Sequence, residues 1–293
     1  MASSPHGYRG RAVKGMRDLL PPETRLWCAV EDTARRVFDL YAFEEIRTPI
    51  VEETELFVRG VGESSEIVGK QMYTFTDKKG KSLSLRPENT ASVARAFVQH
   101  RLSERPAPVR LFYIGPQFRY ERPQKGRYRQ FFQIGAELLG DPGPWSDVEI
   151  IVLLMSFLKA LGFTKLEAQI NTVGDPESRR RYSAALRDYL SPRAGELGED
   201  SRRRLETNPL RILDSKMPAE IALLEDAPDI QDYLSSESRQ HFDAVLGGLD
   251  ELGIAYQVQP RLVRGLDYYT RTVFEIASAD LGAQNAISNT VRV

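Results

Sequence analysis

The stretch that most constrains the fold is residues 117–137, QFRYERPQKGRYRQFFQIGAE. Residues 109–121 and 129–139 each alternate between two kinds of side chain at period two, which predicts a pair of β-strands around a turn. An ordinary hairpin needs no concentration of positive charge, and the planar fork of arginine suits phosphates and carboxylates. Five cations nevertheless fall within eleven residues: Arg119, Arg122, Lys125, Arg127 and Arg129. We therefore expect a β-hairpin that holds an anion.

The two predicted strands have one apolar face and one face with mostly polar and charged side chains, because alternate residues of a strand point to opposite sides of the sheet. The apolar row is Phe112, Ile114, Phe118, Tyr120, Phe132, Ile134, Ala136 and Leu138. The opposite row is Gln117, Arg119, Glu121, Phe131, Gln133, Gly135 and Glu137. This second row could bind a nucleotide lying flat on the sheet, with Phe131 stacking on a base, Arg119 taking a phosphate and Gly135 leaving room for the ligand. The alternative is an amphipathic hairpin whose outer face is only hydrated.

A second stretch of the same character is LVRGLDYYTRTVFEI, residues 262–276. Strand alternation is present from Thr272 onward, whereas RGLDYY interrupts it with a glycine, an acid and two adjacent tyrosines. Tyr268 and Tyr269 would point to opposite faces of an extended chain, so we expect one in the core and one beside a cavity. The residues alone leave open whether this loop and strand bind a ligand.

Composition places the chain among ordinary globular proteins. It has 293 residues, 41% hydrophobic and 28% charged, and its net charge of −1 is not that of a strongly basic nucleic-acid-binding protein. Cys28 is the single cysteine, and His6, His100 and His241 lie far apart, so we expect neither a disulfide framework nor a local metal motif. There is no 18-residue apolar run and no secretory leader pattern at the N-terminus, so we expect a cytoplasmic protein without a membrane span.

Hydrophobic spacing predicts the remaining elements. Helices are expected over 23–41, after Pro87, and over 145–161, and strands over 43–57 as an edge strand broken by Pro49, over 71–86 as a hairpin turning at Gly80, and over 165–173. From about 174 to 254 the chain changes to short helical pieces with arginine triplets at 179–181 and 202–204. We interpret 174–254 as a helical module inserted into a sheet domain, although such triplets are also typical of solvated helix faces.

These stretches resemble the signatures of one family, the histidyl-tRNA synthetases, which are class II aminoacyl-tRNA synthetases. FRYERPQKGRYRQFFQIGAE is similar to motif 2 of that class in its histidyl form, and LVRGLDYYTRTVFEI is similar to the family's histidine-specific signature. The first helix with RTPIVEETELF resembles motif 1, whose proline would be Pro49. The resemblance runs from about Gly15 to Ile287.

The resemblance implies an α+β fold, with a class II antiparallel sheet flanked by helices and a small inserted helical domain. Residues 1–173 and 255–293 would form the catalytic core, and 174–254 would be the insertion that approaches the acceptor stem of tRNA(His), where its arginines would contact phosphates. The implied activity is that of a histidine–tRNA ligase, which uses histidine, ATP and Mg²⁺, and the implied assembly is a homodimer formed through motif 1.

The resemblance also implies roles for individual residues. Arg119 would grip the α-phosphate of ATP, Phe131 would stack on adenine, and Glu121 would contact adenine or the metal region. Arg264 would contact the α-phosphate and the substrate carboxylate, so Arg119 and Arg264 are the expected catalytic residues. The implied histidine-binding set is Glu88, Thr90, Gln133, Glu137, Arg264, Tyr268 and Tyr269. Within it, the first three would hold the α-amino group, and Glu137 and Tyr269 the imidazole; metal ligands stay unassigned.

The sequence departs from the family pattern in two places. Asn89 stands where many bacterial members have glycine, which leaves the ligand-binding positions unchanged. After LGAQNAI the chain reads SNTVRV, where the family continues into motif 3 and an anticodon-binding domain. We therefore expect a core without either part, impaired in catalysis and with exposed sheet edges. Two alternatives are a histidine-sensing regulatory paralogue of ATP phosphoribosyltransferase without aminoacylation, and a nonfunctional dimerising fragment; RGLDYY and the arginine-bearing insertion favour the synthetase over the paralogue.

Overall fold

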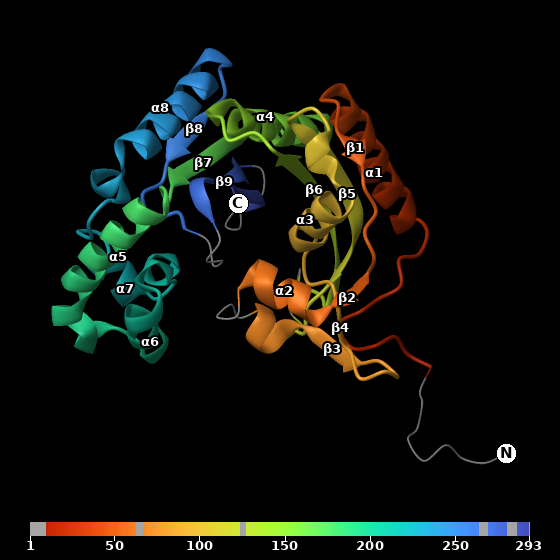
Figure 1. Ribbon diagram of the computed structural model, residues 1–293, viewed down its shortest axis with the longest axis horizontal. Helices are drawn as coiled ribbons and strands as arrows, with labels where there is room; N and C mark the ends of the chain where they lie inside the picture. The colour runs from red at the N-terminus through yellow and green to blue at the C-terminus, as the bar shows by residue number, and fades with distance from the viewer. Residues whose placement is uncertain (1–9, 63–66, 124–126, 264–268, 280–285, 293) are drawn as a thin grey trace, which may run out of the picture. The chain divides into compact units, whose positions relative to one another are not determined.

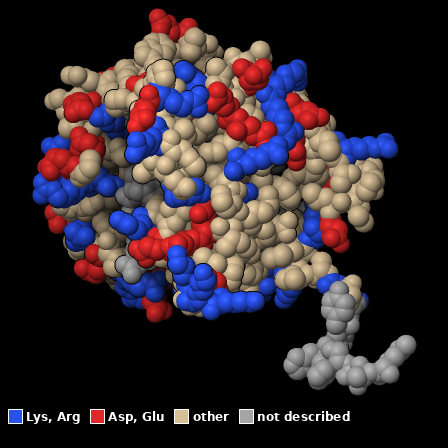
Figure 2. Space-filling view, turned by 45° about the vertical axis from the view of Figure 1, so that its right-hand side comes forward, with Lys and Arg blue, Asp and Glu red and all other residues tan. Residues whose placement is uncertain are grey.

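The structure is a computed structural model that describes residues 10–62, 67–123, 127–263, 269–279 and 286–292. The chain forms two compact units, Met1–Gly140 and Asp141–Val293, here named the N-terminal and C-terminal units. Each unit contains its own β-sheet with helices beside it (Figure 1). Among the described residues, no helix is both long and apolar enough to cross a membrane. Figure 2 shows Lys and Arg side chains interleaved with Asp and Glu side chains over the visible face.

The main sheet of the N-terminal unit is built on the predicted cationic hairpin. Its strands are β1 (Glu44–Glu45), β5 (Val109–Phe118) and β6 (Gln130–Leu139), in the order β1-β5-β6, with β5 and β6 antiparallel. Phe112 lies opposite Ala136, so the apolar row shares one face as the alternation predicts. The helix α1 (Glu23–Leu40) packs on this face, where Phe38 meets Phe112 edge-on with ring centroids 5.1 Å apart and Trp27 meets Phe132 at 4.9 Å.

A smaller antiparallel sheet in the same unit has the strand order β2-β4-β3, formed by β2 (Val51–Glu53), β4 (Ser82–Leu85) and β3 (Tyr73–Thr76). The hairpin predicted over 71–86 is confirmed. Its turn contains Gly80 at φ +85°, a left-handed conformation that glycine adopts without steric cost. The helix α3 (Thr90–Gln99) follows this sheet, and single turns lie at Ile67–Gln71 and Leu102–Glu104.

The predicted edge strand over 43–57 is wrong in its last part. Only Glu44–Glu45 and Val51–Glu53 are strands, and α2 (Thr54–Val61) is a helix. Phe57 and Val61 are both fully buried and stand four residues apart, so they lie on the same helix face. In this short segment, burial of one helical face overrides the strand-like composition of the residues before it.

The C-terminal unit is a four-stranded sheet covered by two long helices. Its strands are β7 (Leu166–Thr172), β8 (Tyr256–Val258), β9 (Thr270–Ser278) and β10 (Ala286–Arg292), in the order β10-β9-β7-β8. The pair β7–β8 is parallel and the other pairs are antiparallel. The helices α4 (Pro144–Ala160) and α8 (Ser236–Glu251) pack on each other and against β9 (Figure 1).

Short helices fill the chain between β7 and α8, as the texture of the sequence predicts. They are α5 (Pro176–Leu190), α6 (Glu199–Thr207) and α7 (Pro218–Leu223), with 3₁₀ turns at Ser191–Glu196, Pro209–Asp214 and Ile230–Tyr233. Their hydrophobic core includes Tyr182, Leu186 and Leu190 of α5, and it also contains Val263 and Val273 from the sheet side of the unit. The interpretation of 174–254 as a separate inserted domain stays a prediction.

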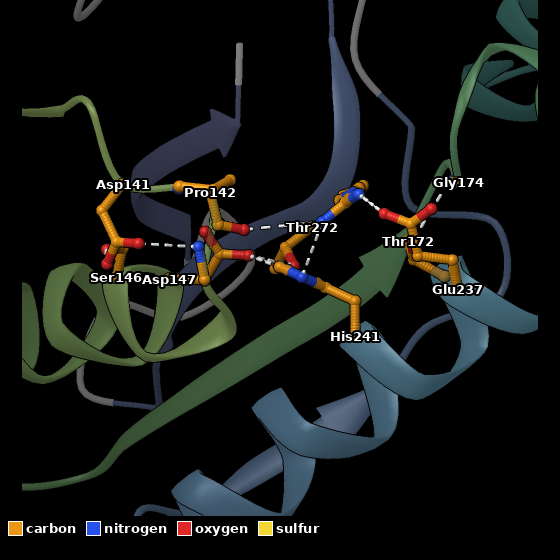
Figure 3. A network of polar contacts seen from close by, with 11 residues as sticks. Asp141, Pro142, Ser146, Asp147, Thr172, Gly174, Glu237, His241 and Thr272 are labelled. Carbon is orange, nitrogen blue, oxygen red and sulfur yellow. Dashed lines mark hydrogen bonds and ion pairs between the residues drawn. The ribbon is translucent and has the colours of Figure 1, made fainter.

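A polar network, buried at Asp147 and His241 and exposed at Glu237, joins α4, α8 and β9 (Figure 3). One carboxylate oxygen of Asp147 lies 2.8 Å from His241 Nε2 and accepts a hydrogen bond of 2.6 Å from the Thr272 hydroxyl. Arg271 Nη1 donates to His241 Nδ1 at 3.0 Å, and its Nη2 pairs with Glu237. Because Nδ1 accepts a hydrogen bond, the proton of a neutral His241 ring is on Nε2, which donates to Asp147. Hydrogen bonds and an ion pair thus link the two helices to each other and to the sheet.

Candidate substrate-binding site

The start of α3 and the C-terminal part of β6 bring two carboxylates and a hydroxyl together. Thr90 Oγ1 donates to Glu137 Oε1 at 2.8 Å. Glu88 accepts hydrogen bonds from the backbone N–H groups of Thr90 (2.7 Å) and Ala91 (3.1 Å), which would otherwise lack partners at the helix start. The local need to satisfy the first turn of α3 thus fixes Glu88 and Thr90 beside Glu137. Three residues of the implied histidine-binding set form one cluster, here named the acidic cluster (Glu88, Thr90 and Glu137).

Burial perturbs both carboxyl groups of the acidic cluster. Burial raises the pKa of Glu137 from 4.5 to about 7; the Thr90 hydrogen bond opposes the rise, and the nearby charge of Glu88 adds to it. The pKa of Glu88 is also raised by burial, against the lowering effect of its two backbone donors and of Arg119. A buried carboxyl that titrates near neutral pH exchanges between hydrogen-bond donor and acceptor. Glu137 can therefore respond to a partner that itself carries an N–H group.

Tyr113 of β5 is a member of this site that the sequence analysis missed. It lies directly opposite Gly135 of β6, and a Cβ atom placed on Gly135 would come within 2.3 Å of the Tyr113 hydroxyl oxygen. The Tyr113 ring thus occupies the space above Gly135. The expectation that Gly135 leaves room for a ligand is wrong, because a neighbouring side chain fills that room. The sequence places Tyr113 and Gly135 on the same face of the hairpin, and this pairing of a large ring with a residue that has no side chain could have predicted the contact.

The phenol of Tyr113 adds a third acid to the acidic cluster. Burial raises its pKa well above 10, as do the charges of Glu137 and Glu88, while Thr90 is a hydrogen-bonding neighbour that acts in the opposite direction. Tyr113 therefore stays protonated at neutral pH.

A second glycine on the same face makes room for an arginine. Gly115 lies opposite Gln133, and a Cβ on Gly115 would come within 2.5 Å of an Arg86 Nη atom. Arg86 is buried, and it donates from Nε to the Pro116 carbonyl at 2.9 Å and from Nη1 to the Thr48 carbonyl at 2.9 Å. The two glycines of this face thus permit close packing of Tyr113 and Arg86 over the sheet, which alternation alone did not indicate.

Two glutamines on this face have buried amide atoms that lack a hydrogen-bond partner among the described residues. Among the described residues, no hydrogen-bond partner is found for Gln133 Oε1 or for either amide atom of Gln117. The register places Gln117 opposite Phe131, and Gln133 is two residues further along β6, so the two amides are diagonal neighbours. A buried, unsatisfied amide group costs about 1–3 kcal/mol. These atoms therefore favour a polar ligand or water at this position; Gln133 was expected in the site and Gln117 was not.

Arg119 and Phe131, the residues implied to hold ATP, contact each other. The Arg119 guanidinium carbon lies 5.1 Å from the centroid of the Phe131 ring, within cation–π range, and Arg119 Nε donates to the Pro87 carbonyl at 2.9 Å. Pro87 directly precedes Glu88, so this contact ties Arg119 to the acidic cluster. The implied phosphate-binding and base-stacking residues therefore adjoin the implied amino-acid site on one sheet face.

The loop between β5 and β6, residues 119–129, is here named the cationic loop, and its charge is partly neutralised within the hairpin. Glu121, implied to contact adenine or the metal region, lies 3.8 Å from Arg127 Nη1, and its carbonyl oxygen accepts from Arg129 Nε at 3.1 Å. Arg129 also stacks on Tyr120, with 3.8 Å between the guanidinium carbon and the ring centroid. Arg127 and Arg129 thus have partners in the hairpin itself, and Lys125 lies outside the described residues.

The remaining implied site residues belong to the C-terminal unit. Tyr269 precedes β9, and its carbonyl oxygen accepts a hydrogen bond of 2.6 Å from Arg179 Nη1. Arg264 and Tyr268 lie outside the described residues. The convergence of Tyr269 and Arg264 with the acidic cluster stays a prediction.

Comparison with known proteins identifies the family. The family profile described as Histidyl-tRNA synthetase matches residues 15–287. The chain belongs to the histidyl-tRNA synthetase family. Among curated relatives, the histidine–tRNA ligase of Solibacter usitatus is 54% identical over 277 residues, which are 94% of this chain and 67% of that relative. The histidine–tRNA ligase of Halothermothrix orenii is 53% identical over 94% of this chain and 66% of its own length. The chain thus spans about two thirds of the length of these relatives.

Solved structures confirm the predicted class II synthetase fold for this histidyl-tRNA synthetase family member. The apo histidyl-tRNA synthetase of S. aureus superposes with a TM-score of 0.73 at 36% identity, over 96% of this chain and 64% of that chain. A Bacillus halodurans protein described as an ATP phosphoribosyltransferase regulatory subunit/histidyl-tRNA synthetase gives a TM-score of 0.68 at 25% identity, over 94% and 75%. The ligases are the more similar of these relatives in sequence, so the comparisons do not favour the regulatory alternative.

Proposed function

We propose that this chain carries the amino-acid-activating site of a histidine–tRNA ligase, which converts histidine and ATP to histidyl-adenylate and passes the histidyl group to the 3′ end of tRNA(His). The observation that carries the proposal is the acidic cluster. It lies on the same sheet face as the Arg119–Phe131 pair in a chain of the histidyl-tRNA synthetase family. In the proposal, the acidic cluster would hold the amino acid and the Arg119–Phe131 pair the nucleotide.

Glu137 is the residue that would recognise the imidazole ring. Its carboxyl, whose pKa is raised to about 7, gains a second hydrogen-bond partner when an imidazole N–H is placed against it. Beside an apolar competitor it keeps only the Thr90 hydroxyl and stays desolvated. Glu88 and Thr90 would hold the α-amino group, together with Gln133, whose Oε1 has no partner among the described residues and is free to accept an N–H. Histidine therefore satisfies groups that an aliphatic amino acid would leave unsatisfied.

The activation step needs no protein base, because the histidine carboxylate is already ionised at neutral pH. One carboxylate oxygen attacks the α-phosphorus of ATP, a new P–O bond forms, and the bond to the β-phosphate bridging oxygen breaks to release pyrophosphate. Arg119 would stabilise the negative charge that develops on the α-phosphate, with Phe131 fixing the adenine, and Arg264 would assist from the C-terminal unit. Preorganised charge of this kind lowers the barrier by positioning rather than by proton transfer.

Magnesium is proposed as an ion carried by the ATP phosphates. Within the described part of the chain, no group of three or more His, Cys, Asp or Glu side chains is arranged to hold a metal ion. Mg²⁺ is commonly bound through one or two carboxylates plus substrate phosphates, so a closed protein cage is not required. Glu121, near the start of the cationic loop, is the proposed carboxylate on the protein side.

Three further parts of the proposal concern the surroundings of the site. Residues 174–254 would approach the acceptor stem of tRNA(His) through arginines at phosphates, an interaction that weakens with salt. A homodimer would form through the segment around Pro49. A cytoplasmic location is proposed because aminoacylation supplies translation.

The test measures histidine binding by calorimetry and histidine-dependent ATP–pyrophosphate exchange on the same preparation. The proposal expects histidine to bind, exchange to depend on histidine, and Glu137→Gln to weaken both. Arg202→Gln, an exposed arginine of α6, is the matched control and should change neither. Histidine binding without exchange at any ATP concentration would favour the histidine-sensing alternative, and absence of histidine binding would reject the assignment of the acidic cluster.

A further inference from the structure

The segment that carries Glu88 and Thr90 also holds a buried side chain that is not part of the acidic cluster. Asn89 lies between these two residues and is 1% exposed. Its Oδ1 accepts a hydrogen bond of 2.7 Å from Oγ1 of Thr48, which is also buried and lies 41 residues earlier in the chain. One buried contact therefore ties the start of α3 to a distant segment of the N-terminal unit.

Two ordinary reasons for an asparagine at a helix start do not apply to Asn89. An asparagine at the N-cap usually accepts a backbone N–H of the first turn through its side chain. Among the described residues the Asn89 side chain makes no such bond, and Glu88 accepts from those N–H groups instead. Asparagine is also favoured where the backbone is left-handed, but Asn89 has φ −117° and ψ −15°, which other residues adopt as readily. The amide is therefore needed neither to cap α3 nor to permit its backbone conformation.

The direction of the hydrogen bonds at Thr48 follows from the chemistry of its neighbours. Arg86 Nη1 lies 3.0 Å from Thr48 Oγ1, and a guanidinium group only donates hydrogen bonds. The Thr48 oxygen therefore accepts from Arg86, and its single hydrogen goes to Asn89 Oδ1. Arg86, Thr48 and Asn89 are here named the Thr48 relay. The relay needs an acceptor at position 89, because a residue without one would leave the buried Thr48 hydroxyl unsatisfied.

Arg86 is the fixed end of the Thr48 relay. Its backbone N–H donates to the Ile50 carbonyl at 2.9 Å, and its own carbonyl accepts from the Phe118 N–H at 3.0 Å. Its guanidinium donates to the Pro116 and Thr48 carbonyls, both at 2.9 Å. The relay thus starts from a buried residue that backbone groups hold at its main chain and at its side chain.

A displacement of Asn89 would disturb the hydrogen bonds of both its neighbours. Glu88 accepts from the Thr90 N–H at 2.7 Å, and the Thr90 hydroxyl donates to Glu137 at 2.8 Å. Both bonds depend on the backbone at residue 89, which joins Glu88 to Thr90. Among the described residues Asn89 Nδ2 has no hydrogen-bond partner, so the bond from Thr48 is what fixes this amide.

We propose that Thr48 and Asn89 are positioning residues of the amino-acid site, which hold Glu88 and Thr90 in the geometry that receives the α-amino group of the substrate. The consequence for substrate binding rests on the proposed function, whereas the hold on the segment does not. Neither positioning residue touches the substrate. Loss of the Thr48 relay should therefore weaken binding of the amino acid more than binding of ATP, whose proposed contacts belong to the hairpin.

The first arm of the experiment measures hydrogen exchange of the Thr90 and Ala91 amides, which donate to Glu88, and it needs no substrate. Thr48→Val keeps the shape of the side chain and removes its hydroxyl, and Asn89→Gly removes the acceptor. Each should speed the exchange of both amides about tenfold, the change expected from the loss of one buried hydrogen bond. Thr48→Ser keeps the hydroxyl and should stay within about twofold of the natural protein.

The second arm measures ATP–pyrophosphate exchange with each substrate varied in turn. Thr48→Val should raise KM for histidine about tenfold and change KM for ATP less than about twofold, and Thr48→Ser should keep both natural values. Thr54→Val is the matched control in the same unit, because the Thr54 hydroxyl contacts the hydroxyls of Ser82 and Ser84 at 2.8 and 3.0 Å and takes no part in the Thr48 relay. It should change neither KM nor the exchange of the two amides.

Three results would overturn the proposal. The first is unchanged amide exchange in both Thr48→Val and Asn89→Gly while circular dichroism shows both variants folded. The second is a rise in KM for ATP as large as that for histidine, and the third is an equal effect of Thr54→Val; either would reduce the relay to general support of the fold. A natural protein that neither binds histidine nor exchanges pyrophosphate would instead reject the proposed function, and the amide exchange would still decide whether the relay holds Glu88 and Thr90.

Discussion

Replacement of Glu137 by glutamine should make the protein more stable at pH 8 while it weakens histidine binding. The carboxyl of Glu137 is largely buried, accepts a hydrogen bond from Thr90 and lies close to Glu88, and its pKa is raised from 4.5 to about 7. In the unfolded chain the same carboxyl ionises near its ordinary pKa. Glutamine keeps an oxygen that can accept from Thr90 and never ionises, so it removes the cost of a buried charge without removing the hydrogen bond.

The sign and size of the effect follow from linkage. Below pH 4.5 Glu137 is protonated in both states and contributes no difference. As the pH rises towards 7, the unfolded state releases the proton and the folded state retains it, so the free energy of unfolding of the natural protein falls; above pH 7 the loss is complete. The rise in pKa corresponds to about 3 kcal/mol at most. Because Glu137 retains partial solvent exposure, the observed difference should lie somewhat below this figure.

The assay is urea unfolding at pH 5 and pH 8, followed by tryptophan fluorescence. The chain has two tryptophans, and Trp27 reports on the N-terminal unit because it packs against Phe132. A Trp145→Phe background therefore isolates the relevant transition. The free energy of unfolding of Glu137→Gln, relative to that of the natural protein, should rise by about 2–3 kcal/mol between pH 5 and pH 8. The control is Glu104→Gln, because the Glu104 carboxylate is exposed; its free energy of unfolding relative to the natural protein should not change between the two pH values. Parallel pH dependences for the natural protein and Glu137→Gln would refute the assignment of a raised pKa to Glu137.

Three other perturbations test the packing and the chemistry. Gly135→Ala places a methyl group against the Tyr113 hydroxyl and should destabilise the N-terminal unit by about 1–3 kcal/mol in urea unfolding, whereas Gly69→Ala, with open space around it, should be nearly neutral. Arg119→Ala should lower histidine-dependent pyrophosphate exchange by about 10²–10³-fold with unchanged circular dichroism; a smaller loss than tenfold would remove Arg119 from the catalytic set. Asp147→Ala removes the oxygen that contacts both His241 and Thr272 and should cost about 1–3 kcal/mol in thermal unfolding; an unchanged melting temperature would show that the network of Figure 3 does not stabilise the fold.

Local pattern was sufficient for most of the elements. The antiparallel pair β5–β6 and its apolar face follow from alternation, because a period of two admits only one assignment of residues to faces. The hairpin turning at Gly80 and the helices α1, α3 and α4 were likewise predictable from turn chemistry and helical spacing. The helix α2 was not, since Phe57 and Val61 give only one helical repeat, too short a pattern to distinguish from a strand.

The amino-acid sequence by itself determined which residues share the polar and charged face of the hairpin and, through two long motifs, the family to which the chain belongs. Only the tertiary structure showed that Tyr113 fills the space above Gly135, that Arg86 fills the space above Gly115, and that burial brings the pKa of Glu137 to about 7. The physical reason is that alternation fixes the direction of a side chain relative to its own strand. Close packing and desolvation depend on atoms brought from distant parts of the chain, and these decide what covers that face and how its charges titrate.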